Sequence, residues 1–242
     1  MKKKIVALCL CVALAVVAIG GATLAYFTDT DKADNVFTTG KVDIALEENF
    51  EQNSKLLPAT GSAQQGTLQN GVKKEVAVKV EAGSEDTYVR VHIAIPNILD
   101  NGDPEFDAGK NVLHFNYPEN STGEGKWDWS KTTGAPYEGD YNYYETTIDG
   151  IKYNVYVVTY GTALKAGETT SDYAMQQVYL DSKVTNSDIA KINAALGNNW
   201  EIKVIAEGCQ AAGFSDAYAA LNASFGVPGK YTPAAWAPTT GE

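Results

Sequence analysis

Short runs in which apolar and polar side chains alternate restrict the fold of this chain more than any other feature. Residues 41–46, 76–80 and 89–95 each carry an apolar side chain at every second position. A period of two places those side chains on one face of a β-strand and the intervening ones on the other face. Such strands bury their apolar faces against another sheet, so the pattern predicts a mainly β fold, an antiparallel β-sandwich.

The clearest local unit is a hairpin in residues 141–160, "YNYYETTIDGIKYNVYVVTY". Asp149 and Gly150 stand between two β-forming runs. Asp-Gly is a strong hairpin signal because both central residues of the tight turn need a positive φ. Further strands are expected within 159–180 and 199–210.

Two short helices are predicted among the strands. The first covers "NSDIAKINAALG", with Asn186 or Ser187 as its N-cap. The second covers "SDAYAALNASFG", with Ser215 as its N-cap and its end near Gly226. The segment that follows, "VPGKYTPAAWAPTTGE", is rich in proline and is expected to be a flexible tail.

The first 25 residues have the order of an export signal. Three lysines precede an uncharged apolar run, Ile5 to Ile19, and small residues follow it. Thr23 and Ala25 occupy the −3 and −1 positions of a peptidase site, which predicts a mature chain that begins at Tyr26. The alternative is a retained anchor, because the uncharged stretch 5–25 is just long enough to span a bilayer.

Charge and cysteine usage narrow the class of protein. The formal net charge is −11, and the signal removes three lysines. A chain this acidic is not expected to bind nucleic acid or anionic lipid. Cys9 and Cys11 lie in the signal, so Cys209 is the only cysteine of the mature chain and an internal disulfide is excluded there. Stability must then come from core burial.

The junction after the signal carries a family pattern. Residues 22–46 contain a small-residue cleavage site, an aromatic, "F-T-D", a polar stretch, "N-x-F-x-x-G" and an alternating strand. After the cleavage site the pattern falls on these positions: Tyr26, Phe27, Thr28, Asp29, Asn35, Phe37, Gly40, Asp43 and Ile44. This pattern resembles the TasA, camelysin and BsaA group of exported matrix proteins of Gram-positive bacteria. "DTYVRVHIAI" (86–95) and "IKVIAEGCQAAGFSDAYAALNASFG" (202–226) are similar to later parts of the same group.

The resemblance implies a jelly-roll-like sandwich that is secreted and assembles into surface or biofilm fibres. It also implies that a signal peptidase of the SipW type removes residues 1–25. The expected partners are copies of the same chain, and other matrix proteins or cell-wall glycans. No cofactor is expected.

The segment from Tyr26 to Val36 is the expected assembly segment. Once freed from the membrane, a flexible stretch with aromatic and β-forming residues can add to the open sheet edge of another subunit. The alternatives are a disordered lead-in and an edge strand of the domain's own sheet. The expected organisation is therefore signal 1–25, assembly segment 26–36, sandwich 37–226 and tail 227–242.

"LPATG" at 57–61 spells a sortase recognition motif, with cleavage between Thr60 and Gly61. A working sorting signal lies near the C-terminus and is followed by an apolar run and a basic tail. This motif lies near the N-terminus and is followed by "SAQQGTLQNG". It is therefore interpreted as a loop between strands.

Catalysis finds little support in the sequence. Some camelysins are described as metalloproteases, but the chain has no H-E-x-x-H motif and no G-x-S-x-G motif. His92 and His114 both fall on the expected polar face of a strand, so they are predicted to be surface histidines rather than zinc ligands. Cys209 is expected to be a buried structural thiol.

Two stretches leave binding functions open. Asp29, Asp31 and Asp34 lie close together, but a helical calcium loop needs glycine where Asp34 stands, so a solvated acidic segment is expected. "KWDWS", with Trp127 and Trp129, and "YEGDYNYYE" are rich in aromatics. They would suit a monomeric adhesin that stacks sugar rings on an exposed platform. Half-burial between the sheets is the commoner arrangement, and a fibre subunit is the favoured function.

Overall fold

The computed structural model describes residues 40–51, 54–59, 70–100, 106–107, 111–118, 125–129, 143–197 and 200–236. By its contacts the chain divides into residues 1–41 and a second unit, Val42–Glu242, which holds all the described strands and helices.

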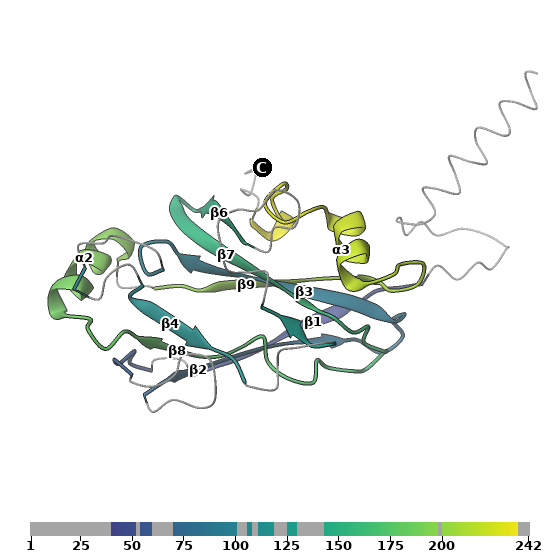
Figure 1. Cartoon of the computed structure of the whole chain (residues 1–242), viewed down its shortest axis with the longest axis horizontal. Helices are drawn as coiled ribbons and strands as arrows, with labels where there is room; N and C mark the ends of the chain where they lie inside the picture. Colours follow the sequence, from purple (N-terminus) through teal and green to yellow (C-terminus); the bar gives the residue numbers. More distant parts are fainter. Residues whose placement is uncertain are drawn as a thin grey trace, which may run out of the picture. The chain divides into compact units, whose positions relative to one another are not determined.

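Two antiparallel sheets form the unit (Figure 1). The four-stranded sheet has the order β1 (Ile44–Phe50), β2 (Val72–Val80), β8 (Met175–Leu180) and β4 (Leu113–Asn116). The five-stranded sheet has the order β5 (Trp127–Asp128), β7 (Ile151–Tyr160), β3 (Thr87–Pro96) and β9 (Lys203–Gln210), and β6 (Tyr143–Ile148) also pairs with β7. The prediction of a mainly β antiparallel sandwich with two short helices is confirmed.

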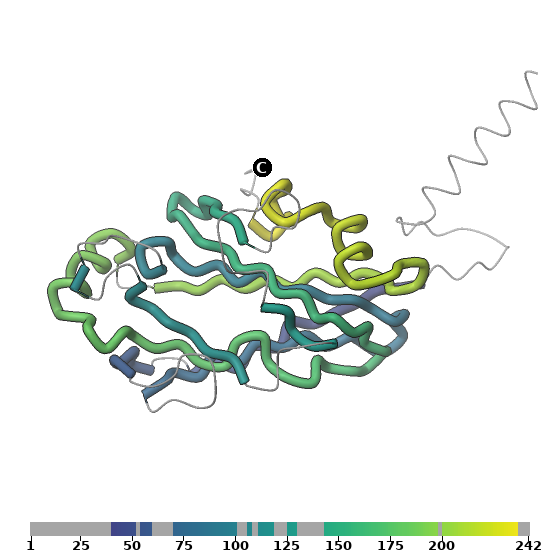
Figure 2. Tube along the Cα trace, viewed as in Figure 1, coloured from purple at the N-terminus to yellow at the C-terminus, as the bar shows by residue number. Residues whose placement is uncertain are grey.

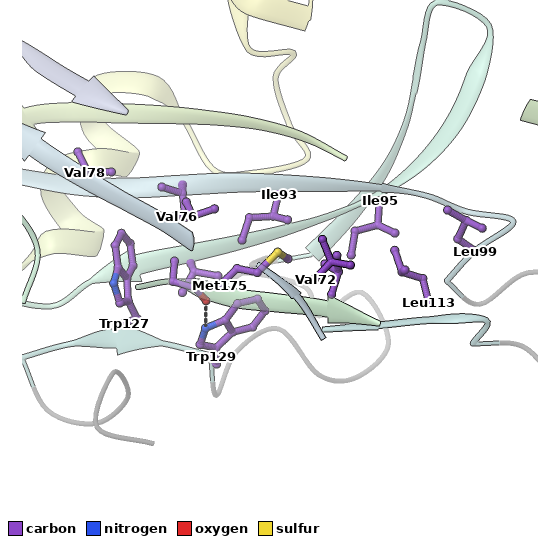
Figure 3. Close-up of a cluster of buried hydrophobic side chains, with 14 of the residues drawn as sticks. Val72, Val76, Val78, Ile93, Ile95, Leu99, Leu113, Trp127, Trp129 and Met175 are labelled. Carbon is purple, nitrogen blue, oxygen red and sulfur yellow. Dashed lines mark hydrogen bonds between the residues drawn. The ribbon is translucent and has the colours of Figure 1, made fainter. Parts of the chain in front are cut away.

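The core lies between the sheets and follows from the alternation in the sequence. The inward side chains of β2 and β3 are almost wholly removed from water, including Val76, Val78, Val91 and Ile93. Trp127 and Trp129 are also buried there, beside Met175 (Figure 3).

The indole nitrogens of the two tryptophans donate hydrogen bonds inside the protein. Trp127 Nε1 lies 2.8 Å from the carbonyl oxygen of Asp172, and Trp129 Nε1 lies 3.0 Å from that of Ala174. A buried indole needs such an acceptor, and both have one. The favoured interpretation, in which these tryptophans are buried between the sheets, is therefore confirmed, and the alternative of sugar stacking on Trp127 and Trp129 is not supported, because neither ring is at the surface.

The hairpin prediction is confirmed by the backbone. Asp149 and Gly150 join β6 to β7 with φ values of 52° and 81°. These are the positive values that the two-residue turn requires.

Both helices are present, but each is capped by a residue other than the predicted one. Helix α2 (Asn186–Leu196) is capped by Thr185, whose hydroxyl accepts from the backbone of Asp188 while the Asp188 carboxylate accepts from the backbone of Thr185. This reciprocal capping box satisfies two helix-end donors, which neither Asn186 nor Ser187 does. Helix α3 (Ala217–Phe225) is capped by Asp216 rather than Ser215, and it ends at Gly226 as expected.

Residues 227–236 are not a loose tail. They end in a 3₁₀ turn, Ala234–Trp236, and the Trp236 side chain is only 7% exposed. Trp236 packs on the outer face of the five-stranded sheet, against Ala94, Tyr153 and Val155. Figure 2 shows the backbone of this stretch, in yellow, on the same side of the five-stranded sheet as α3. Despite its proline content, this stretch is held in place by apolar packing against the sheet.

Candidate functional site: the seam between β1 and β9

Strands β1 and β9 each stand at the edge of their own sheet. In the part of the chain that the structure describes, β1 pairs only with β2 and β9 only with β3. The two edges come together at Gly208, where an added Cβ would lie 2.9 Å from Cγ2 of Ile44. We call the facing edges of β1 and β9 the β1–β9 seam. A glycine at position 208 is what allows this close approach.

The seam opens into a pocket at the other end of β1. The pocket has a volume of about 560 Å³. Phe50, Val72, Lys74 and Ile202 line it at the seam, and Leu113 of β4 and Val178 of β8 also line it. Phe50 ends β1, and Ile202 immediately precedes β9. The seam is therefore narrow at Ile44 and Gly208 and wide at Phe50 and Ile202.

Apolar side chains along the seam are only partly covered. Ile44 and Leu46 of β1, and Val204 and Ala206 of β9, pack on the main core but keep intermediate exposure. Their neighbours one strand further in, such as Val78 and Val91, are fully buried. A further strand laid along the seam would remove this apolar surface from water and pair a free edge.

The opposite side of the sandwich is bridged by aromatic rings. Phe115 of β4 lies 5.1 Å from Trp129 and 5.6 Å from Tyr156 of β7, measured between ring centroids. Tyr117 stacks on Trp129 at 5.1 Å. These contacts tie the two sheets together at β4, in contrast to the wide end of the seam.

A second group of residues joins the outer face of the five-stranded sheet to the C-terminal part of the chain. Glu207 accepts from Arg90 Nε at 2.7 Å and lies 3.0 Å from His92 Nε2. The Tyr231 hydroxyl lies 2.7 Å from both Glu207 oxygens and accepts from Arg90. Arg90 also donates to Asn222 Oδ1 and to the Gly226 carbonyl. We call Arg90, His92, Glu207 and Tyr231 the clamp.

The expectation that His92 is a surface residue is wrong. Its side chain is fully buried, because α3 and residues 226–236 cover this face of the sheet. Its Nδ1 lies 3.1 Å from the Tyr144 hydroxyl, so both ring nitrogens have partners. His114 is half-buried and lies 2.8 Å from Asp181 Oδ2, with its ring stacked on Tyr179.

Burial governs the proton affinities in the clamp. Desolvation lowers the pKa of His92 below its usual value of 6.5, although the Glu207 carboxylate opposes this shift. Burial alone would raise the pKa of Glu207, but the hydrogen bond with His92, the charge of Arg90 and the hydrogen bond from Tyr231 lower it to about 2. At neutral pH the clamp therefore consists of a charged Arg90–Glu207 pair beside a neutral imidazole.

The described residues hold no group of three or more His, Cys, Asp or Glu side chains placed to bind a metal ion. Cys209 is buried, as predicted for a structural thiol, and burial raises its pKa. A raised pKa keeps the thiol protonated and a poor nucleophile.

Several predicted positions lie outside the described residues. They are the cleavage positions Thr23, Ala25 and Tyr26, the assembly residues Phe27, Thr28, Asp29, Asn35 and Phe37, and the acidic residues Asp31 and Asp34. Of the LPATG motif, Pro58 forms a bridge with Leu180 and Ala59 is buried, whereas Thr60 and Gly61 are not described. No helix among the described residues is long and apolar enough to cross a membrane.

Comparison with known families bears on the N-terminal third of the chain, which includes β1 and β2. Residues 1–82 match the camelysin metallo-endopeptidase family. The match confirms the resemblance carried by the opening motif. No curated protein and no solved structure matches the chain.

Proposed function

We propose that this protein is a secreted structural subunit of an extracellular fibre or biofilm matrix. After a SipW-type peptidase removes residues 1–25, residues 26–36 of one copy add to the β1–β9 seam of the next. The family match over residues 1–82 and the opening motif support an exported, biofilm-related protein. The seam supports the mode of assembly.

One observation carries the proposal: two strand edges face each other with partly covered core side chains between them. A strand added there gains backbone hydrogen bonds from the edge and apolar contacts from Leu46, Val204 and the pocket. Segment 26–36 has 11 residues and β1 has seven. At roughly 3.3 Å per extended residue, the segment is long enough to follow the whole of β1.

The test compares a mature chain that begins at Tyr26 with one that begins at Asn35. We expect the first to form fibres in electron micrographs and to sediment as polymer. The second should remain monomeric while melting cooperatively at a similar temperature, because the three hydrophobic clusters of the described residues all lie C-terminal to residue 40. Fibres from the shorter chain would show that the segment is not the connector.

A point variant sharpens this comparison. Phe27→Asp should also prevent assembly, because it would place an unpaired charge against an apolar pocket. Phe214→Asp is the matched control, since Phe214 is exposed on the loop before α3 and does not line the seam. The control variant should assemble normally.

The match to a metallo-endopeptidase family makes proteolysis the second candidate function. It would require metal ligands outside the described residues, or a metal held by fewer than three His, Cys, Asp or Glu side chains. A monomeric adhesin is the remaining alternative, and it differs from a fibre subunit by staying monomeric after signal removal.

A further inference from the structure

The position of Lys74 is unusual for a residue that lines the pocket. Lys74 lies at the irregularity of β2 where the register with β8 shifts between Lys73 and Val76, and it lines the pocket together with Val72. Lys74 is only 7% exposed, and its ammonium pairs with Glu48. The ammonium also lies 5.4 Å from the centroid of the Phe50 ring. Burying a lysine beside apolar side chains is costly, so its place in the pocket calls for a reason beyond the Glu48 pair.

An aromatic occupant of the pocket would supply that reason. Lysine ammonium groups are attracted to the faces of aromatic rings, and the attraction grows as water is excluded. Lys74 already approaches Phe50, whose own ring is 47% exposed. A second ring in the pocket would meet the same ammonium and cover Phe50, whereas an aliphatic side chain would only fill the volume.

The shape of the seam then fixes a direction. Within segment 26–36 the aromatic side chains, Tyr26 and Phe27, stand at the start, and small or polar residues follow. The wide end of the seam is at Phe50 and the narrow end is at Gly208. A segment whose first residues enter the wide end runs from Phe50 toward Ile44, antiparallel to β1. Antiparallel pairing also gives the slightly more stable ladder.

We propose that the pocket at Phe50 and Lys74 selects an aromatic side chain, supplied by Phe27 of a second copy. Lys74 is the specificity-determining residue, and the added segment runs antiparallel to β1. This inference rests on the proposed function, because it assigns the residues that recognise the assembly segment.

A double-mutant cycle in the mature chain tests the role of Lys74. The measured quantity is the critical concentration for assembly, read from the monomer left after sedimentation. Phe27→Leu should raise it about tenfold, equivalent to about 1.4 kcal/mol. In a Lys74→Met background the same change should cost less than about threefold, because the cation is gone while the side-chain length is kept.

Lys73→Met is the matched control, because Lys73 lies on the other face of β2 and its side chain is 41% exposed. The Phe27→Leu penalty should persist in that background, and thermal melts should show each variant folded. An equal penalty in the Lys74→Met and Lys73→Met chains would overturn the role of Lys74 while leaving the fibre model intact. A wild-type chain that stays monomeric would overturn the fibre model and this inference together.

Discussion

Arg90 on β3 and Glu207 on β9 are direct partners in the antiparallel ladder, and their side chains form an ion pair that is almost fully buried. The Arg90 side chain is 2% exposed and the Glu207 side chain is 9% exposed, and Arg90 Nε lies 2.7 Å from Glu207 Oε2. The same guanidinium reaches Asn222 of α3 and the Gly226 carbonyl, and Tyr231 completes the group. The clamp thus joins two strands, a helix and the C-terminal segment.

Glu207→Gln should strongly destabilise the domain. The substitution leaves Arg90 buried without a counter-charge, which costs about 3 kcal/mol. For a domain of this size the melting temperature should fall by roughly 6–12 °C. Denaturant unfolding measures the loss, and Glu201→Gln is the control, because Glu201 pairs with Lys203 at the surface with its side chain 62% exposed. The control should change stability by less than about 1 kcal/mol.

Stability should fall on acidification below pH 6.5. Because the folded pKa of His92 lies below 6.5, the unfolded chain takes up a proton that the folded chain excludes as the pH falls through this value. Glu207 adds a second loss from pH 4.5 downward, since its folded pKa is about 2. Tyr144 of β6, and Tyr231 and Trp236 of the C-terminal segment, face His92 from the other packed elements. Burial raises the pKa of Tyr144 and of Tyr231 above the usual tyrosine value, so neither contributes in this range.

Unfolding free energies between pH 4.5 and 7.5 test this dependence. In His92→Gln, which cannot take up the proton, the slope between pH 4.5 and 6.5 should be shallower than in the wild type. Identical slopes would show that His92 is not the titrating group. His114→Gln serves as the control for a half-buried histidine.

The exported chain should begin at Tyr26. Thr23 and Ala25 are the small residues at the spacing that a signal peptidase requires. N-terminal sequencing of secreted material measures the start directly, and Ala25→Leu should block processing. A secreted protein that retains Met1 would make residues 5–25 an anchor and would argue against free assembly.

The purified mature chain should not cleave casein in a zinc-dependent manner. Both nitrogens of His92 are engaged inside the protein, and His114 is paired with Asp181. Neither belongs to a group of three or more potential metal ligands among the described residues. Proteolysis that a chelator abolishes, and that His92→Ala or His114→Ala removes, would assign a metallo-endopeptidase activity to this chain.

The direction of strand addition can be checked with cysteines. A disulfide requires the two Cα atoms to lie within about 7 Å. Thr28→Cys combined with Asn49→Cys, which keeps Phe27 and Phe50, should therefore link neighbouring subunits on oxidation, whereas Thr28→Cys combined with Ile44→Cys should not. Cys209 is buried and should stay unreactive. Efficient linkage through position 44 would mean that the segment runs the other way.

Most of the strands and the β6–β7 hairpin could be predicted because the alternation and the Asp149–Gly150 turn act locally. The strand order and the short strands β4 and β5 were not predicted. The observed N-caps, Thr185 and Asp216, are not the residues that the sequence predicted. For the first helix the reason is visible in the local sequence. Thr185 and Asp188 have the spacing of a capping box, and the predicted caps overlooked that reciprocal pair.

The clamp could not be predicted from the pattern of β3. Arg90 and His92 alternate with core valines, so they occupy the face that a two-layer sandwich turns to water. That face is buried because α3 and residues 226–236 pack on it. This packing depends on the tertiary fold and not on the local sequence of β3. A weak signal was present in the apolar sequence of α3 and in Trp236, which need a surface to cover.

The seam depends even more on long-range arrangement. Ile44 and Gly208 are far apart in the sequence, and their contact follows from two sheets whose edges converge. The sequence marks Gly208 only as a glycine inside a strand, which is consistent with a bulge or a close approach. It does not reveal the partner.

The narrow end of the seam has a mechanical consequence. In the proposed arrangement Phe27 enters at Phe50, so the rest of its own subunit leaves past Ile44 and Gly208. Tension between neighbouring subunits would then act parallel to the inserted strand. Such a shear force is shared by all the backbone hydrogen bonds between this strand and β1 at the same time. Forced separation is governed by the unfolding rate rather than by equilibrium affinity. A fibre built in this way would resist pulling better than the affinity of a single junction suggests.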